Sequence, residues 1–138
     1  MSYNRSNIGS GSRNVGRNTF EFGRTYVVMP KGTHQATIVW LHAIGETGSS
    51  WTQFLESLPI PNIKWICPTA PTRPITLFGG HHSTAWFNVE GLSENATDDV
   101  DGLDASATHI VNMLSNEHDD SKFQSPMSIS FDKYLLAY

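Results

Sequence analysis

Residues 37–51 read Thr-Ile-Val-Trp-Leu-His-Ala-Ile-Gly-Glu-Thr-Gly-Ser-Ser-Trp, and they predict a strand, a loop and a helix in succession. The apolar run at residues 37–41 indicates a buried strand, of the kind that a parallel sheet covers on both faces. A loop with glycines begins at His42. An amphipathic helix over residues 50–58 follows, because apolar residues recur there at i, i+3, i+4 and i+7. A strand–loop–helix of this kind can point backbone N–H groups at a developing negative charge, as an oxyanion hole does.

The elements around this stretch complete an α/β pattern. Residues 20–28 alternate in part and predict an edge strand, and residues 64–67 form a second buried strand that Pro68 ends. A loop punctuated by prolines follows. Residues 98–116 place apolar side chains on one helical face and begin with aspartates, which the helix dipole favours at that end. The order strand–helix–strand–loop–helix predicts an α/β fold with a parallel sheet.

Size and composition restrict the class of protein. The 138 residues suffice for one modest domain, and a hydrophobic content of 38% with four tryptophans indicates a packed core. A net charge of −4 gives no electrostatic reason to expect a nucleic-acid partner. No apolar stretch reaches the roughly 20 residues of a membrane span, so we expect no integral membrane segment. Cys67 is the single cysteine, which suits a reducing compartment, and the predicted location is cytoplasmic.

The chain divides into three segments. Residues 1–18 are predicted to be a flexible polar tail, because they are rich in serine, asparagine and glycine and lack the amphipathic pattern of a transit peptide. Residues 19–120 form the partial α/β domain. Residues 121–138 differ abruptly in character and are interpreted as a divergent C-terminal tail. A strand at residues 127–131 within this tail would need a neighbouring strand to pair with.

Three stretches of the chain resemble the acyl-protein thioesterases and small carboxylesterases of the α/β-hydrolase fold, most of all their plant members. They are residues 37–51, residues 63–76 (Ile-Lys-Trp-Ile-Cys-Pro-Thr-Ala-Pro-Thr-Arg-Pro-Ile-Thr) and residues 85–87 (Ala-Trp-Phe). The resemblance covers residue 20 to about residue 117, and implies the N-terminal portion of an α/β-hydrolase fold with an incomplete sheet. It further implies a serine carboxylesterase or acyl-protein thioesterase, with an acylated protein or small ester as substrate and no cofactor.

The resemblance also assigns site residues. The family's version of the first stretch reads His-Gly-Leu-Gly-Asp, and the residue at the leucine position donates its backbone N–H to the oxyanion. That position is Ile44 in this chain, and His42 and Gly45 are predicted to support the loop. Trp86 corresponds to a residue that lines the substrate cleft, although a core aromatic residue behind a loop is the alternative.

Three positions depart from the family pattern. Ala43 replaces a glycine and Glu46 replaces an aspartate in the loop, while Asn88 stands where the family usually has aspartate. If position 43 requires a positive φ angle, an alanine there costs on the order of 1 kcal/mol and displaces the loop.

The 138 residues contain no Gly-x-Ser-x-Gly elbow, the turn that presents the nucleophile in this fold. The last glycine is Gly102, and the acid and histidine of the triad follow the elbow in chain order. We therefore predict a truncated hydrolase, with the triad absent and no hydrolytic activity in this form. The alternative is a non-catalytic interaction module, or a pseudoenzyme short form, that pairs with a full-length homologue.

Other reactive side chains are interpreted as structural. His81 and His82 are adjacent and point to different sides of the chain, so they make a poor metal site alone. The acidic stretch at residues 90–120 is interpreted as a solvated helix face, with His109 on its polar side or margin. Cys67 is predicted to be an inert core thiol, and Ser128 and Ser130 to be ordinary tail serines. We expect no metal.

Overall fold

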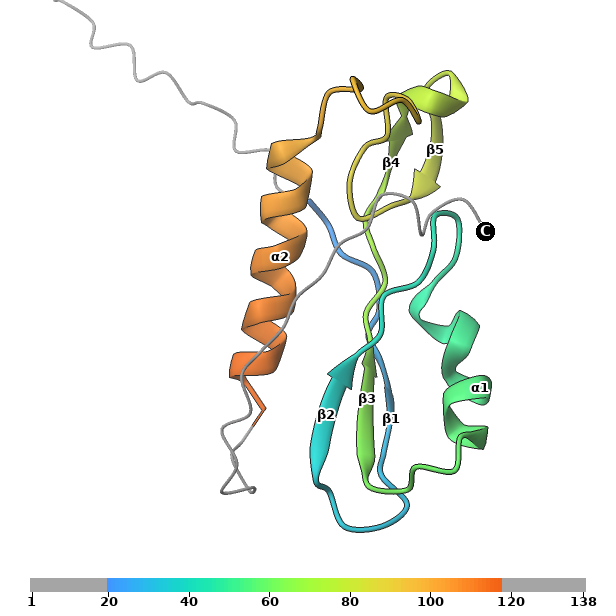
Figure 1. Ribbon diagram of the computed structural model, residues 1–138, viewed down its shortest axis with the longest axis vertical. Coiled ribbons are helices and arrows are strands. Elements are labelled where there is room, and N and C mark those ends of the chain that lie inside the picture. The colour runs from blue at the N-terminus through green and yellow to red at the C-terminus, as the bar shows by residue number, and fades with distance from the viewer. Residues whose placement is uncertain (1–19, 118–138) are drawn as a thin grey trace, which may run out of the picture.

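The computed structural model describes residues 20–117, which form a three-stranded sheet with one helix on each face and a separate hairpin at one end (Figure 1). The strands are β1 (Tyr26–Val28), β2 (Ala36–Val39) and β3 (Ile63–Cys67), in the order β1-β3-β2. β2 runs parallel to β3, and β1 runs antiparallel to it. The parallel pair β2–β3, joined through a helix, confirms the predicted α/β architecture.

β3 is the central strand, and its burial agrees with the buried strand predicted for residues 64–67. Trp65, Ile66 and Cys67 are all buried, because β3 has a strand on each side and a helix over each face. Burial raises the pKa of the Cys67 thiol, as expected for an inert core cysteine. The core under the first helix consists of Val28, Leu55, Trp65 and Cys67.

β2 lies at the edge of the sheet, and the prediction of a buried strand at residues 37–41 is wrong. The strand alternates between exposed and half-buried residues, and Ile38 is 39% exposed. Among the described residues, no strand pairs with the side of β2 that faces away from β3. An apolar sequence indicates that a strand can be buried. Whether it is buried depends on which other elements pack beside it, and the local sequence does not specify them.

The helix that follows β2 is shorter than residues 50–58. A single 3-10 turn, η1 (Gly48–Trp51), leads into α1 (Thr52–Ser57), which ends before Pro59 as predicted. Four aromatic rings form a row from the core toward solvent on this face. Ring centroids lie 6.1 Å apart for Trp65 and Trp40, 5.8 Å for Trp40 and Trp51, and 5.9 Å for Trp51 and Phe54, which is 50% exposed.

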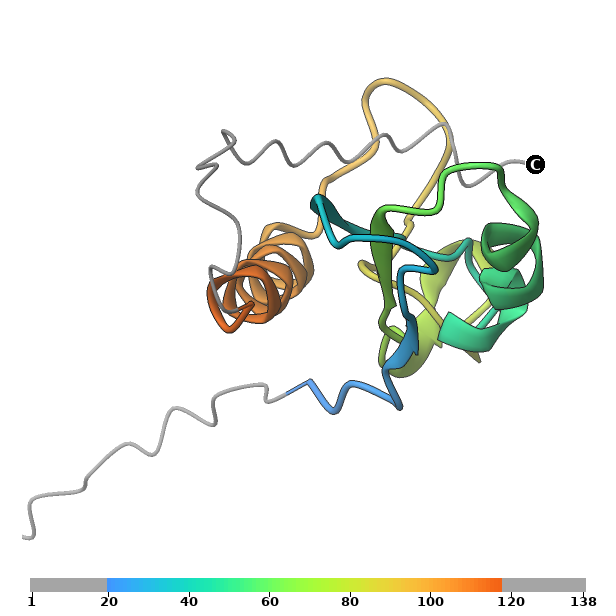
Figure 2. The ribbon, with the colours of Figure 1, turned by 90° about the horizontal axis from the view of Figure 1, so that it is seen from below.

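The second helix, α2 (Val100–Ser115), packs on the opposite face of the sheet from α1 (Figure 2). Its Asp99 cap and its buried Ile110 match the pattern predicted for residues 98–116. At its C-terminal end, Glu117 pairs with Lys64 of β3 at 2.8 Å and accepts a hydrogen bond from Thr37 of β2. No helix in the described part of the chain has both the length and the apolar character needed to cross a membrane.

The stretch predicted to be a proline-punctuated loop contains a hairpin. β4 (Thr72–Ile75) pairs antiparallel with β5 (His81–Thr84), and the short turn η2 (Thr76–Phe78) joins them with Gly79 and Gly80 in the left-handed region. Pro74 lies within β4 opposite His82. Proline is compatible with a two-stranded ribbon, because each strand has an edge where no N–H is required.

Most of the predicted tails lie outside the described residues. This holds for residues 1–18 and 121–138, including the possible strand at residues 127–131, Ser128 and Ser130.

Candidate functional site

The loop that follows β2 bends at Gly45. This glycine has a φ angle of +83°, and no other described residue outside the hairpin turn has a positive φ. Ala43 therefore keeps an ordinary backbone conformation, and its replacement of a glycine carries no strain. The Gly45 N–H donates to the Thr84 carbonyl at 2.9 Å, and the Thr84 hydroxyl donates to the Glu46 carbonyl at 2.6 Å. The end of β5 thus holds the loop in place.

His42 anchors the start of the loop as a neutral imidazole. Its side chain is 3% exposed, and Nε2 accepts a hydrogen bond from the Ala70 N–H at 3.0 Å. Because a backbone N–H can only donate, Nε2 carries no proton, and the proton on Nδ1 donates to the Ala43 carbonyl at 2.7 Å. Burial lowers the pKa of His42, although the Ala43 carbonyl and the charge of Glu46 oppose that effect.

Trp86 lies under the loop. It is 4% exposed, and its indole N–H donates to the His42 carbonyl at 3.0 Å, while its own carbonyl accepts from Ser106 of α2 at 2.5 Å. These contacts match the alternative interpretation of Trp86 as a core aromatic residue behind the loop. Its role in lining a substrate cleft stays a prediction.

Glu46 ties the two ends of the loop region together. One carboxylate oxygen accepts hydrogen bonds from the Ala43 N–H at 3.0 Å and from the Trp51 indole N–H at 2.7 Å. Both are charge-assisted, which makes them stronger than bonds between neutral groups. The glutamate that replaces the family's aspartate therefore links the loop to the first turn after it.

Three of the five backbone N–H groups in the loop at residues 42–46 are occupied, and those of His42 and Ile44 have no partner among the described residues. The N–H of Ala43 donates to the Glu46 carboxylate, that of Gly45 to Thr84, and that of Glu46 back to the Ala43 carbonyl at 3.1 Å. The Ile44 N–H makes no hydrogen bond with any described residue. The free Ile44 N–H thus lies between two residues, Ala43 and Gly45, whose own N–H groups are occupied, and a donor fixed in this way can stabilise an oxyanion.

An ion pair that sequence reasoning missed supports the region behind the loop. Arg73 of β4, which is 7% exposed, donates to Asp99 at 2.8 Å, and Asp99 also accepts from the N–H groups of Asn88 and Gly102. Burial raises the pKa of the Asp99 carboxyl, but the Asn88 and Gly102 N–H groups and the Arg73 guanidinium outweigh it, so the pKa is lowered. An arginine between prolines, far from an aspartate in sequence, gives no local signal of such a pair.

Asn88 has its own local role. Its side-chain oxygen accepts from the Thr76 N–H at 2.9 Å, and its side-chain amide donates to the Thr76 hydroxyl at 2.8 Å. The second bond requires an amide donor, which an aspartate at this position would lack.

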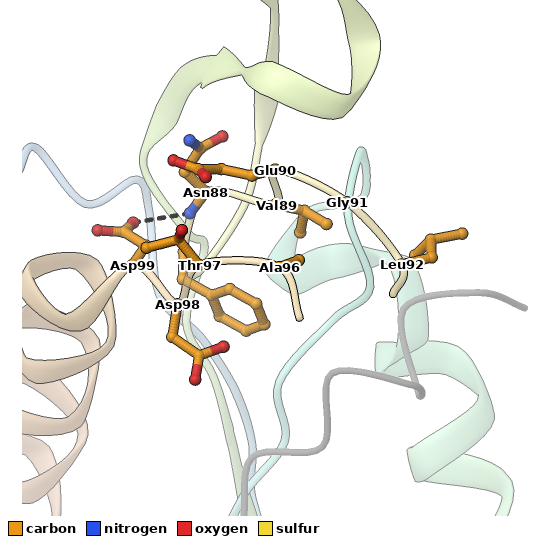
Figure 3. A pocket seen from close by; sticks show the side chains of 10 residues that line it. Asn88, Val89, Glu90, Gly91, Leu92, Ala96, Thr97, Asp98 and Asp99 are labelled. Atoms are coloured by element: carbon orange, nitrogen blue, oxygen red, sulfur yellow. Dashed lines mark hydrogen bonds between the residues drawn. The ribbon is translucent and has the colours of Figure 1, made fainter. Parts of the chain in front are cut away.

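A small cavity lies beside Asn88 (Figure 3), between the segments that leave β5 and enter α2. Its volume is about 30 Å³, and residues 87–92 and 96–99 line it. That space matches about one water molecule, so the cavity is too small for an acyl chain. Its lining includes no residue of the loop at 42–46.

The remaining histidines form no site among the residues that the structure describes. His81 and His82 are exposed on β5, and residues 20–117 contain no group of three side chains suited to hold a metal ion. His109 lies at the margin of the polar side of α2, which was one of the two predicted positions. It is half-buried and stacks on Phe22, with ring centroids 3.7 Å apart.

The sequence of this chain is similar to a known family and to several of its members. Residues 23–130 match the sequence profile of the Phospholipase/Carboxylesterase family, a range that includes part of the segment 121–138. Acyl-protein thioesterase 1 homolog 1 of Dictyostelium discoideum is 30% identical over 101 residues, which are 71% of this chain and 45% of that protein. Acyl-protein thioesterase 1 of Cryptococcus neoformans is 36% identical over 81 residues, or 55% of this chain and 34% of that protein.

Solved structures agree with these relatives. The crystal structure of Zea mays acyl-protein thioesterase 2 is 66% identical, with a TM-score of 0.69 over 71% of this chain and 42% of that chain. Arabidopsis thaliana SOBER1 is 26% identical, with a TM-score of 0.52 over 59% of this chain and 41% of that chain. The resemblance to acyl-protein thioesterases, with its plant character, is confirmed. The chain spans less than half the length of each of these relatives.

Proposed function

Because the chain belongs to the Phospholipase/Carboxylesterase family of α/β-hydrolases, we propose that its loop at residues 42–46 is the oxyanion-binding part of a serine hydrolase site. The proposed substrates are palmitoyl-type thioesters of proteins or small carboxylic esters, in keeping with relatives named acyl-protein thioesterase. The single observation that supports this most is the unoccupied Ile44 N–H, which lies between the occupied N–H groups of Ala43 and Gly45.

The loop would act in the chemical step rather than in substrate binding. When a serine attacks a thioester or ester carbonyl, the carbonyl oxygen becomes negatively charged, and a fixed N–H at about 3 Å stabilises that charge. A donor held in place before the reaction needs no reorganisation when the charge forms. His42, Gly45 and Glu46 provide this fixing through their contacts with Ala70, Thr84 and Trp51.

We propose that the polypeptide of residues 1–138 does not hydrolyse esters by itself. The sequence has no Gly-x-Ser-x-Gly elbow, and a serine at its ordinary pKa is a weak nucleophile without a base beside it. A purified sample should show no turnover of a short-chain aryl ester above background. Labelling by a fluorophosphonate probe would contradict this.

A chimera tests the loop separately from the missing nucleophile. In it, residues 23–117 replace the matching segment of Zea mays acyl-protein thioesterase 2, which is 66% identical. We expect the chimera to hydrolyse an acyl thioester, and Ile44→Pro to lower its kcat by a factor of about 10² to 10³, because proline lacks the N–H.

The matched control for this test is Ile44→Leu, which keeps the donor and should keep kcat within a factor of about three. The proposal fails if the proline variant of the folded chimera turns over as fast as the leucine variant. It also fails if a folded chimera is inactive with Ile44 in place.

A non-catalytic interaction module is the second candidate function. The open edge of β2 favours it, because unpaired backbone groups at a sheet edge can pair with another chain. A full-length homologue is the partner that the sequence suggested. Co-purification of a tagged homologue with this chain would support that pairing, and its absence at micromolar concentrations of both would contradict it.

A cytoplasmic location remains part of this proposal. The free, buried thiol of Cys67 is compatible with a reducing compartment. Imaging of the chain with a fluorescent tag in plant cells would test it, and accumulation in an organelle would contradict it.

A further inference from the structure

The peptide unit between Ala43 and Ile44 is held at its carbonyl oxygen by two donors. Nδ1 of His42 lies 2.7 Å from this oxygen, and the Glu46 N–H donates to it at 3.1 Å. In a trans peptide the C=O and the N–H lie in one plane and point in opposite directions, and no described peptide bond is cis. Whatever fixes the Ala43 carbonyl therefore also fixes the direction of the Ile44 N–H.

Of these two donors, the His42 ring is the one with support from outside the loop. Its Nε2 accepts a hydrogen bond from the Ala70 N–H at 3.0 Å, which leaves the ring proton on Nδ1. The ring also contacts that of Trp86, with centroids 5.1 Å apart. The Glu46 N–H, by contrast, belongs to the same four-residue turn as the carbonyl that it binds. The imidazole therefore connects the peptide unit to the segments that follow β3 and β5.

The peptide units on both sides of this one are fixed as well. The Ala43 N–H donates to the Glu46 carboxylate at 3.0 Å, and the Gly45 N–H donates to the Thr84 carbonyl at 2.9 Å. Because both neighbours are held, the middle unit has little freedom to rotate. Its exact direction then depends on the hydrogen bonds at its own carbonyl oxygen.

From this geometry we propose that His42 is a positioning residue, which directs the Ile44 N–H at the oxyanion by donating from Nδ1 to the Ala43 carbonyl. The inference rests on the proposed oxyanion loop and adds to it, because the contact with Ala70 alone would only anchor the ring. A donor on the carbonyl oxygen also polarises the amide and makes its N–H a stronger donor. The bond from Nδ1 acts on charge that develops in the transition state, so it should affect kcat rather than KM.

Two amide side chains separate the two hydrogen bonds of the ring. His42→Asn carries an NH₂ group where Nδ1 lies, so it keeps a donor for the Ala43 carbonyl but does not reach Ala70. His42→Gln places its amide oxygen near the position of Nε2, so it keeps the acceptor for Ala70 and has no donor for Ala43. In the chimera described above, His42→Gln should lower kcat by a factor of about 10 to 10² with KM nearly unchanged. His42→Asn should keep kcat within a factor of about three of the parent chimera.

A second measurement uses the 138-residue chain itself and needs no activity. The imidazole nitrogen chemical shifts, measured by NMR at about pH 7.5, should show a neutral His42 ring that is protonated on Nδ1. The carbonyl carbon shift of Ala43 should change in His42→Gln and stay close to its parent value in His42→Asn. A ring protonated on Nε2 would overturn the inference, whatever the kinetics of the chimera.

The kinetic outcomes separate this inference from the proposed function. Equal turnover of Ile44→Pro and Ile44→Leu refutes the proposed oxyanion loop, and the inference with it. Loss of turnover in Ile44→Pro together with full turnover in His42→Gln refutes the inference alone. An equal loss in the two His42 variants, both folded by circular dichroism, assigns the effect to the Ala70 contact and also overturns the inference. The tautomer of the parent chain tests the inference even where a variant does not fold.

Discussion

The loop at residues 42–46 and the outer edge of β2 belong to one continuous stretch of chain, yet their backbone groups are satisfied to very different degrees. In the loop, the N–H groups of Ala43, Gly45 and Glu46 have partners in β5 or in the loop itself, and the His42 ring accepts a hydrogen bond from the segment after β3. At the edge, the outward groups of Thr37 and Val39 have no described partner. Tertiary contacts therefore fix the loop, whereas the outer edge of the adjoining strand is unpaired among the described residues.

This contrast predicts that changes behind the loop disturb the fold strongly, and that Asp99→Ala has the largest effect. We expect the free energy of unfolding to fall by about 3 kcal/mol, because Arg73 becomes a buried charge without a partner and α2 loses its cap. Urea unfolding measures the change. Asp104→Ala, at an exposed carboxylate of the same helix, is the control and should stay within about 0.5 kcal/mol. Equal losses in the two variants would show that the ion pair is unimportant.

A methyl group at Gly48 should have the next largest effect. A Cβ at this position would lie 2.2 Å from the Cys67 carbonyl oxygen, so the turn that follows the loop must move away from β3. We expect Gly48→Ala to lower the free energy of unfolding by about 2 kcal/mol, a usual cost of overpacking. Gly91→Ala is the control, because its Cβ would meet nothing closer than 3.6 Å. A thermal midpoint unchanged in Gly48→Ala would contradict the close approach.

Acidic pH should lower the free energy of unfolding, because His42 beside the loop is buried in its neutral form. Burial lowers the pKa of His42 below its ordinary value of 6.5, so the unfolded chain binds the proton more readily than the folded one. The contribution of His42 to stability should therefore be constant above about pH 7 and fall as the pH drops below 6.5. Urea unfolding at pH 7.5 and at pH 5.5 measures the fall.

The control for this pH dependence is His42→Gln, whose neutral side chain has no proton to gain. Part of the slope should persist in it, since burial also lowers the pKa of His109. A variant whose stability falls with acid as steeply as that of the parent chain would exclude His42 as the cause.

The smallest effect is expected at the open edge. Ile38→Thr removes apolar volume from a side chain that is 39% exposed and keeps the β-branched shape, so the free energy of unfolding of the monomer should change by no more than about 0.5 kcal/mol. Urea unfolding at low micromolar concentration measures it. A loss above 1 kcal/mol would mean that the edge is covered in the monomer, and the contrast between the two regions would disappear.

The sequence correctly predicted the helices and strands whose formation depends on a local pattern of residues. The helix over residues 98–116 and the strand over residues 64–67 appear as α2 and β3, because apolar periodicity and aspartates at a helix start act within a few residues. β4 and β5 were missed, since a proline and two histidines give a weak strand signal, and the strands depend on their pairing and on contacts with distant residues.

For the candidate site, the sequence indicated which residues belong to the loop, and the structure showed their hydrogen bonds and ion pairs. The resemblance assigned Ile44, His42 and Gly45 to the loop, and those assignments stay predictions. Nothing local indicates that Glu46 bonds to Trp51, or that Arg73 reaches Asp99 across the hairpin. Such pairs depend on tertiary distances, and the conformation of Ala43 likewise depends on how the whole loop is held.

The four tryptophans allow the α1 side of the sheet and the loop at residues 42–46 to be followed by separate optical signals. The Trp40 ring lies about 6 Å from the rings of both Trp51 and Trp65, with planes tilted by 51° and 76°, so their electronic transitions couple and contribute exciton bands to the circular dichroism spectrum. Trp86, the fourth tryptophan, lies instead beneath the loop, against His42. Exciton bands therefore report the docking of α1, and emission from a variant that retains Trp86 alone reports the loop.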